Sequence, residues 1–330
     1  MTIRLPQNDM KRIIQAEDKL RLAVARKIRM SIIRKATGAE MDISLSYPSR
    51  LIDYHENLGI KDDIPLGNMS VCRLSEDRLL VSIRQFTYKI DKDNRYIHFP
   101  GSFEGIGCNS YLAVVNKRFD FIRNVSCGGL EKMEDIRLLR FGGIIQASGT
   151  DFHHKDDYNM ACVDFNVKGC DFQLEKSSKT SFAFRRDKNY IPIEDERGIF
   201  ITDILDGEIM LSSSANPRRK IRKECVGISK YRGNTQLLRY RDGYVALVHR
   251  VNHAYRKSYL NAFAFFDRNL QQCRISKEFT AFGNVSSINF SCGMVINGEN
   301  ALIPVCVHDR ETHLFEIPLE DFAKTAHWRS

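Results

Sequence analysis

The segment Glu134–Thr150, with the sequence EDIRLLRFGGIIQASGT, carries the pattern that decides the fold. Polar residues precede an apolar run, a Gly-Gly turn follows, and a second apolar run ends in polar residues. The same pattern returns in Asn189–Asp203, Asn234–Arg250 and Ser291–Asp309. These segments begin roughly 45 to 57 residues apart, a period that suits the four-stranded blade of a β-propeller.

Short β-rich runs separated by turn residues continue on both sides of this segment. They are Arg78–Ile83, Ser110–Val115, Gly143–Ser148, Met160–Val167, Gly198–Ile204, Tyr244–His249, Ala262–Phe266 and Ala301–Val307. Asp206-Gly207, Asp242-Gly243 and Asn297-Gly298 are typical of β-hairpin turns. We therefore expect residues 41–330 to form an all-β, five-bladed β-propeller, because nearly 290 residues at this period give about five blades.

Residues 1–40 differ from the rest of the chain and form a separate N-terminal segment. An apolar stripe recurs at helical spacing over residues 8–36. Its members are Ile13, Leu20, Val24, Ile28 and Ile32. The pattern predicts an amphipathic basic helix. The stripe either packs on the propeller, or the helix docks on an anionic membrane or an acidic partner.

The positive charge is concentrated in this N-terminal segment. The whole chain has a net charge of +9, and residues 1–40 hold ten Lys/Arg against four Asp/Glu, a net of +6 that leaves +3 for the remainder. A basic appendage on a nearly neutral body makes nucleic-acid binding an unfavoured alternative. No apolar run is long enough to span a bilayer and no signal peptide is recognisable, so we expect a cytoplasmic protein, with peripheral contact at the inner membrane face through residues 8–36 as an option.

The nine cysteines are scattered and never spaced as Cys-x-x-Cys. This arrangement favours reduced core cysteines over a zinc site, and we expect neither a metal nor another cofactor. Five cations gather within residues 217–223, PRRKIRK. They indicate a solvated loop between strands or, alternatively, a contact to an anionic donor such as a phosphosugar or a sugar nucleotide.

Two adjacent carboxylates, Glu134 and Asp135, stand immediately before an apolar strand. Because side chains alternate along a strand, one of them is expected to face the channel while the other pairs with Arg137. From the residues alone, a turn-capping role and a functional role both stay open. His249, which ends an apolar strand, is likewise either a structural histidine or a ligand contact that lines the channel.

The segment Glu134-Asp-Ile-Arg137 resembles the Glu-Asp-Pro-Arg motif of five-bladed propeller enzymes that act on mannosides. These are the family 130 glycoside phosphorylases and hydrolases and the related family 108 mannosyltransferase/phosphorylase enzymes. Further short segments resemble theirs in the same order, covering about residues 42–320. They are Leu79–Arg84, Asp187–Asn189, Gly233–Gln236 with Asp242–His249, Tyr259–Asp267, Ile288–Met294 and Val307–Glu311.

The resemblance implies a role for each matching residue. Asp135 would be the general acid/base, Arg84, Asn189 and Asp309 would hold sugar hydroxyls, and Lys188 would face phosphate or the departing anionic group. Glu134, Arg137, His249 and Glu311 complete the expected substrate-binding set. Glycosyl transfer needs a proton for the leaving oxygen, and an anionic phosphate nucleophile needs cations rather than a strong base.

The sequence departs from the family pattern at several positions. Ile136 replaces proline, Asn289 replaces glutamate, and Ile201-Thr-Asp203 and Asn261-Ala262 stand where relatives carry His-Arg pairs. The lost cations weaken the expected phosphate cradle. The leading hypothesis is a glycosyltransferase or glycoside phosphorylase that acts on mannose or mannose-like glycosides in glycan synthesis, with a phosphate, phosphosugar or sugar-nucleotide donor. The alternatives are a β-mannoside hydrolase, with Asp309 or Glu311 as second carboxylate, and a non-catalytic sugar-binding propeller.

Overall fold

The computed structural model describes residues 24–25, 27–28, 30–31, 39–91, 95–99, 109–126, 128–130, 132–141, 143–151, 159–168, 173–182, 189, 191–195, 198–205, 208–213, 216–224, 228, 231–252, 258–282 and 288–328. Strands dominate these residues. Within the same ranges, no helix combines the length and apolar character needed to cross a membrane.

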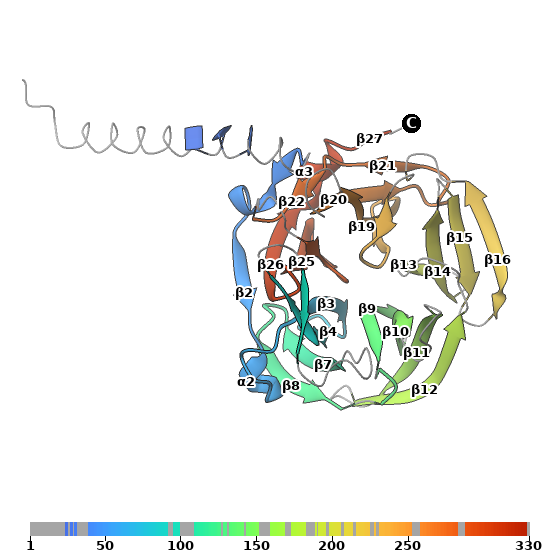
Figure 1. The fold of residues 1–330 in the computed structure, drawn as a ribbon. Coiled ribbons are helices and arrows are strands. Elements are labelled where there is room, and N and C mark those ends of the chain that lie inside the picture. The colour runs from blue at the N-terminus through green and yellow to red at the C-terminus, as the bar shows by residue number, and fades with distance from the viewer. Residues whose placement is uncertain are drawn as a thin grey trace, which may run out of the picture.

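The strands are grouped into sheets that surround a common axis (Figure 1). One sheet has the order β3(Leu66–Arg73), β4(Arg78–Gln85), β7(Asn109–Asn116), β8(Phe121–Val125). The next is β9(Met133–Phe141), β10(Ile144–Asp151), β11(Asn159–Lys168), β12(Gln173–Phe182), followed by β13(Ile191–Asp195), β14(Gly198–Leu205), β15(Glu208–Ser213), β16(Asn216–Glu224). A short hairpin, β5(Tyr88–Ile90) with β6(Tyr96–His98), follows β4.

Segments from the start of the chain join the last two sheets. One is built on β17(Arg232–Gly233), β18(Leu238–Tyr240), β19(Gly243–Asn252), β20(Ser258–Phe266), β21(Cys273–Ile275), β22(Phe279–Thr280) and β27(His327–Trp328), and takes in β1(Met41–Asp42) beside β22. The other is built on β23(Asn289–Phe290), β24(Val295–Asn297), β25(Asn300–Val307) and β26(Glu311–Pro318), and takes in β2(Ser49–Ile52) beside β26. The short helices are η1(Ile43–Leu45), α2(His55–Leu58) and α3(Leu319–Ala323).

The prediction of an all-β chain is confirmed. Each of the eight predicted runs lies within or overlaps a strand, and the turns at Asp242-Gly243 and Asn297-Gly298 join β18 to β19 and β24 to β25. β4 and β25 have neighbouring strands on both sides and are buried along most of their length. This burial explains why their sequences are continuous apolar runs.

The expectation of a solvated loop at residues 217–223 is wrong, because these residues belong to strand β16. β16 pairs with β15 and is the last strand of its sheet. An edge strand tolerates lysine and arginine, which discourage pairing with a second molecule. A high density of charge therefore did not prevent strand formation here.

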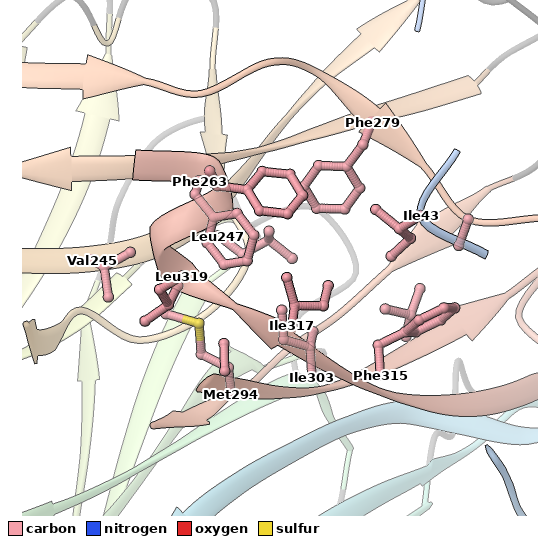
Figure 2. Packing of buried hydrophobic residues seen from close by; sticks show 14 of the residues in the cluster. Ile43, Val245, Leu247, Phe263, Phe279, Met294, Ile303, Phe315, Ile317 and Leu319 are labelled. Carbon is pink, nitrogen blue, oxygen red and sulfur yellow. The ribbon is translucent and has the colours of Figure 1, made fainter. Parts of the chain in front are cut away.

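The core lies between the sheets. One cluster joins the sheet of β19 and β20 to that of β25 and β26, and α3 closes it from outside (Figure 2). Phe263, Phe279 and Phe322 form its aromatic centre, with ring centroids 4.8 to 5.8 Å apart. The described cysteines Cys72, Cys162, Cys273, Cys292 and Cys306 are buried and form no disulfide bond with one another, in keeping with reduced core thiols.

Most of the predicted N-terminal helix lies outside the described residues. Residues 24, 25, 27, 28, 30 and 31 are helical. Val24 and Ile28, two members of the apolar stripe, are 50% and 58% exposed, so at these positions the stripe is not packed on the body. The helix over 8–36 and its membrane contact stay predictions.

Candidate active site

A cavity of about 500 Å³ receives side chains from, or next to, all five of the larger sheets. The cavity is lined by Asn68, Arg84, Tyr88, Tyr96, Glu134, Asp135, Asn189, Arg232, His249, Val251, Tyr259, Ile288, Phe290 and Asp309. Segments separated by more than 200 residues therefore meet at one place. A volume of this size accommodates a small organic ligand.

Buried side chains of neighbouring strands hold the carboxylate of Asp135 in this cavity. Its Oδ1 accepts hydrogen bonds from Asn68 Nδ2 at 2.8 Å and from Arg84 Nη1 at 3.1 Å. Glu134 forms an ion pair with Nη2 of the same guanidinium. All four side chains are buried, with at most 6% of each residue exposed. Arg84 thus orients two neighbouring carboxylates at once, and its guanidinium also lies 4.7 Å from the centroid of the Phe86 ring.

The expectation that one carboxylate faces the channel while the other pairs with Arg137 is wrong. Both carboxylates contact Arg84, and neither carboxylate pairs with Arg137. The cause is a β-bulge in β9. Arg137 is opposite Ser148 and Glu134 is opposite Thr150, so two residues of β9 face Gly149 alone. Asp135 adopts a φ of 52°, which breaks the alternation of side chains on which the sequence-based expectation depended.

A second β-bulge, in β3, positions Asn68, which donates a hydrogen bond to Asp135. In β3, Gly67 is opposite Arg84 and Ser70 is opposite Ser82, so Asn68 and Met69 face one residue of β4. Asn68 has a φ of 43°, a conformation that asparagine tolerates better than most residues. Two adjacent sheets therefore carry equivalent irregularities that turn Asn68 and Asp135 toward each other.

Asp309 faces the same cavity from the turn between β25 and β26. It is 7% exposed, and Tyr88 donates its hydroxyl proton to Asp309 Oδ2 at 2.9 Å. Burial raises the pKa of Asp309 to about 6, although nearby Arg84 and the Tyr88 hydroxyl act in the opposite direction. A carboxyl group with this pKa exchanges protons close to neutral pH.

His249 belongs to an aromatic wall. Its ring stacks on Tyr259 with centroids 4.8 Å apart and meets Phe290 edge-on at 5.4 Å. Nδ1 contacts Asn234 Oδ1, and Asn234 Nδ2 donates to Asn261 Oδ1 at 2.8 Å. The histidine is thus held by neighbouring side chains and also lines the cavity. Its contact with a ligand stays a prediction.

Arg137 does not line the cavity. Arg137 is 1% exposed. Its guanidinium donates hydrogen bonds to the backbone carbonyls of Asp135 at 2.8 Å, Asn234 at 2.7 Å and Gly233 at 3.4 Å. Arg137 therefore ties the backbone of the Asp135 bulge to the segment that carries Asn234. The structure gives it a supporting position rather than the direct substrate contact expected from the sequence.

The remaining predicted residues lie in different places. Asn189 is 7% exposed and lines the cavity. Glu311 does not line it, and its half-exposed carboxylate lies 3.4 Å from Nε2 of His313. Lys188 is outside the described residues. Of the two candidates for a second carboxylate, the cavity therefore contains Asp309.

Sequence reasoning missed several lining residues, including Asn68, Tyr88, Tyr96 and Arg232. The Gly67-Asn68 pair inside an apolar strand was a readable sign of a bulge. Tyr88 and Tyr96 come from a short hairpin and carry no comparable pattern. Among the described lining residues, three carboxylates accompany two guanidinium groups.

Comparison with solved structures finds the same fold in carbohydrate-active enzymes. A β-1,2-mannobiose phosphorylase from Listeria innocua, in complex with β-1,2-mannobiose, matches 84% of this chain and 98% of its own at 12% identity and a TM-score of 0.56. A mannose phosphorylase from Leishmania mexicana, in complex with a phosphate ion, matches 82% of this chain and 89% of its own at 12% identity and a TM-score of 0.50. No protein-family model and no curated protein matches the sequence. The expected resemblance to propeller carbohydrate-active enzymes is therefore confirmed in the fold, which this chain shares with phosphorylases of mannobiose and mannose.

Proposed function

We propose that this protein is a carbohydrate-active enzyme that transfers or phosphorolyses mannose or a mannose-like glycoside, with Asp135 as general acid/base. The observation that carries the proposal is the buried cluster in which Arg84 and Asn68 hold the Asp135 carboxylate at the cavity. In this proposal the five larger sheets of the protein are the five blades of a propeller. The fold shared with two mannose-active phosphorylases supports the substrate class.

The proposed reaction breaks the bond between the anomeric carbon and the leaving oxygen. Phosphate or another acceptor bonds to the anomeric carbon, and Asp135 gives its proton to the leaving oxygen. Arg84 orients Asp135 and Glu134. Asn189 and Asp309 form hydrogen bonds with sugar hydroxyls. The rings of Tyr259 and Phe290 and the imidazole of His249 offer the sugar an apolar wall. Lys188 is the proposed contact for an anionic donor.

The proposal is tested by a donor screen read by mass spectrometry. Purified protein is incubated with mannose 1-phosphate, GDP-mannose and other sugar nucleotides, each with simple mannoside acceptors. We expect product with the native chain and a loss of about 100-fold or more with Asp135→Asn, the range that general acid catalysis contributes. Asp77→Asn, which changes an aspartate whose side chain is 71% exposed, is the matched control.

The donor that is consumed identifies the reaction class. Consumption of a sugar phosphate with release of phosphate indicates a phosphorylase, and consumption of a sugar nucleotide indicates a transferase. Full turnover by Asp135→Asn would contradict the assigned role. Sugar binding by both forms with no donor consumed would indicate a non-catalytic sugar-binding propeller.

Hydrolysis is the second candidate, and Asp309 is the observation that favours it. Water needs a carboxylate base, and Asp309 faces the same cavity as Asp135 with a pKa of about 6. The excess of carboxylates over guanidinium groups among the described lining residues also favours a neutral nucleophile. A hydrolase would release free sugar in phosphate-free buffer, and Asp309→Asn would abolish that release.

A further inference from the structure

A second cavity, of about 400 Å³, lies at the opposite ends of β3 and β9, two strands that also line the first cavity. β3 contributes Asn68 to the first cavity and Arg73 to the second, and β9 contributes Asp135 to the first and Arg140 to the second. Five residues of extended strand span about 16 Å. The residues that line the two cavities are therefore separated by most of the length of these strands.

Buried polar contacts separate the two cavities. Gln236 is 1% exposed, and its Nε2 donates to the carbonyl oxygens of Val71 at 2.8 Å and Met294 at 2.9 Å. Its Oε1 is buried without a hydrogen-bond partner among the described residues, and its side chain lines the second cavity. Gln236 thus contributes a buried amide oxygen without a described partner to the lining of this cavity, which is distinct from the proposed active site.

All the charged side chains among the described lining residues of the second cavity are positive. Its described lining residues include Arg73, Arg140 and Arg239 and no carboxylate. Arg73 Nη2 donates to the Ile296 carbonyl at 2.9 Å, and Arg140 Nη1 donates to the carbonyl of Leu74. Backbone carbonyls therefore help to orient these two guanidinium groups. Arg239 is exposed and lies over the Tyr244 ring at 5.4 Å, so its planar group is also held in position.

The remaining wall is apolar. Leu139, Leu238, Val295 and Ile296 complete the lining together with Cys72 and Ser75. Guanidinium groups recognise the oxygens of a phosphate through paired N–H donors, and an apolar wall favours an organic portion beside it. The combination differs from that of the first cavity, where three carboxylates surround the guanidinium groups.

We propose that this second cavity, lined by Arg73, Arg140 and Arg239, is a binding site for a small molecule that carries a phosphate group. The site is independent of the proposed catalytic function, because none of its lining residues belongs to the first cavity. Inorganic phosphate and phosphate monoesters share the recognised group, and the organic part of a monoester would rest against Leu139 and Val295.

The test is isothermal titration of the full chain with inorganic phosphate and, separately, with adenosine monophosphate at low salt. We expect saturable binding of at least one probe. Arg239→Gln should weaken that binding at least tenfold and Arg239→Glu should abolish it. Tighter binding of the monophosphate would show that the apolar wall contributes, whereas equal binding would show that the phosphate group suffices. Both results support the site.

Two matched substitutions locate the bound probe. Arg232→Gln removes an exposed arginine of the first cavity, and Arg274→Gln removes an exposed arginine of the outer strand β21. The portion of the isotherm that Arg239→Glu removes should persist in both. Binding that survives Arg239→Glu but disappears in Arg232→Gln would overturn the proposal, as would a failure of both probes to bind. Because the readout is binding, a catalytically silent protein leaves this result unaffected.

Discussion

At the scale of single residues, Asp309 has the most informative environment. It is buried beside Arg84, Glu134 and Asp135, and only the Arg84 guanidinium and the Tyr88 hydroxyl favour its ionised form among the interactions that shift its pKa. Burial outweighs them and raises the pKa from 3.8 to about 6. The folded protein therefore holds this proton more tightly than the unfolded chain does.

This difference makes stability depend on pH. Between pH 4 and 6 the folded state binds more protons at Asp309 than the unfolded state, so the free energy of unfolding falls as pH rises through this window. A shift of this size corresponds to on the order of 3 kcal/mol. We predict that Asp309→Asn removes this decline and is more stable than the native chain at pH 7. Urea unfolding at pH 4, 5, 6 and 7 measures the effect.

Tyr88→Phe is the control for this prediction. The Tyr88 hydroxyl lowers the pKa of Asp309, so its removal should extend the decline in stability to higher pH. If native chain and Asp309→Asn lost stability in parallel across the window, the pKa of Asp309 would not be raised.

At the scale of secondary structure elements, the bulges in β3 and β9 decide where the candidate catalytic side chains point. The β9 bulge depends on Gly149. A Cβ atom there would lie 2.7 Å from the Glu134 carbonyl oxygen and 3.3 Å from Ile136 Cγ1. The close approach of the β10 backbone to the bulge thus requires a residue without a side chain.

We predict that Gly149→Ala lowers the free energy of unfolding by about 1 to 3 kcal/mol, the usual cost of overpacking. It should also lower any Asp135-dependent activity, because the clash displaces the backbone of Glu134. The matched control is Gly143→Ala in the preceding turn of the same hairpin, where an added Cβ meets no atom within 4 Å. Chemical denaturation of both variants decides the question, and equal stabilities would contradict the packing argument.

At the scale of the whole molecule, buried polar side chains connect sheets that hydrophobic clusters alone would leave free to slide. Arg137 joins β9 to the segment at Gly233 and Asn234, and Gln236 joins that segment to β3 and to Met294. These contacts link β3 and β9 to the segment between β17 and β18. They help to hold the sheets at the spacing on which both cavities depend.

We predict that Gln236→Ala destabilises the protein by about 2 to 4 kcal/mol, because it leaves the carbonyls of Val71 and Met294 without a donor in a buried site. Gln272→Ala changes an exposed glutamine of the loop before β21 and should stay within about 0.5 kcal/mol of the native chain. Thermal unfolding of the two variants compares them directly. A Gln236→Ala variant as stable as Gln272→Ala would show that the contacts do not hold the sheets together.

The sequence by itself determined the all-β class, the positions of the strands and several turns. Apolar runs and Asp-Gly or Asn-Gly pairs act over a few residues, so local pattern suffices to predict them. The resemblance to family 130 and family 108 propeller enzymes implied that Arg84, Asn189, His249 and Asp309 share a site with Asp135, and all of them line one cavity with Asp135. Their catalytic and binding roles stay predictions.

Only the tertiary structure decided which side chains share a contact. The pairing of Glu134 and Asp135 with Arg84 rather than Arg137 follows from a bulge opposite Gly149, and the exclusion of Glu311 follows from the turn that presents Asp309. Pairing of β2 with β26 across the length of the chain is equally invisible in a local pattern. The physical reason is the same in each case, because backbone irregularities and long-range pairing are selected by the packing of whole sheets.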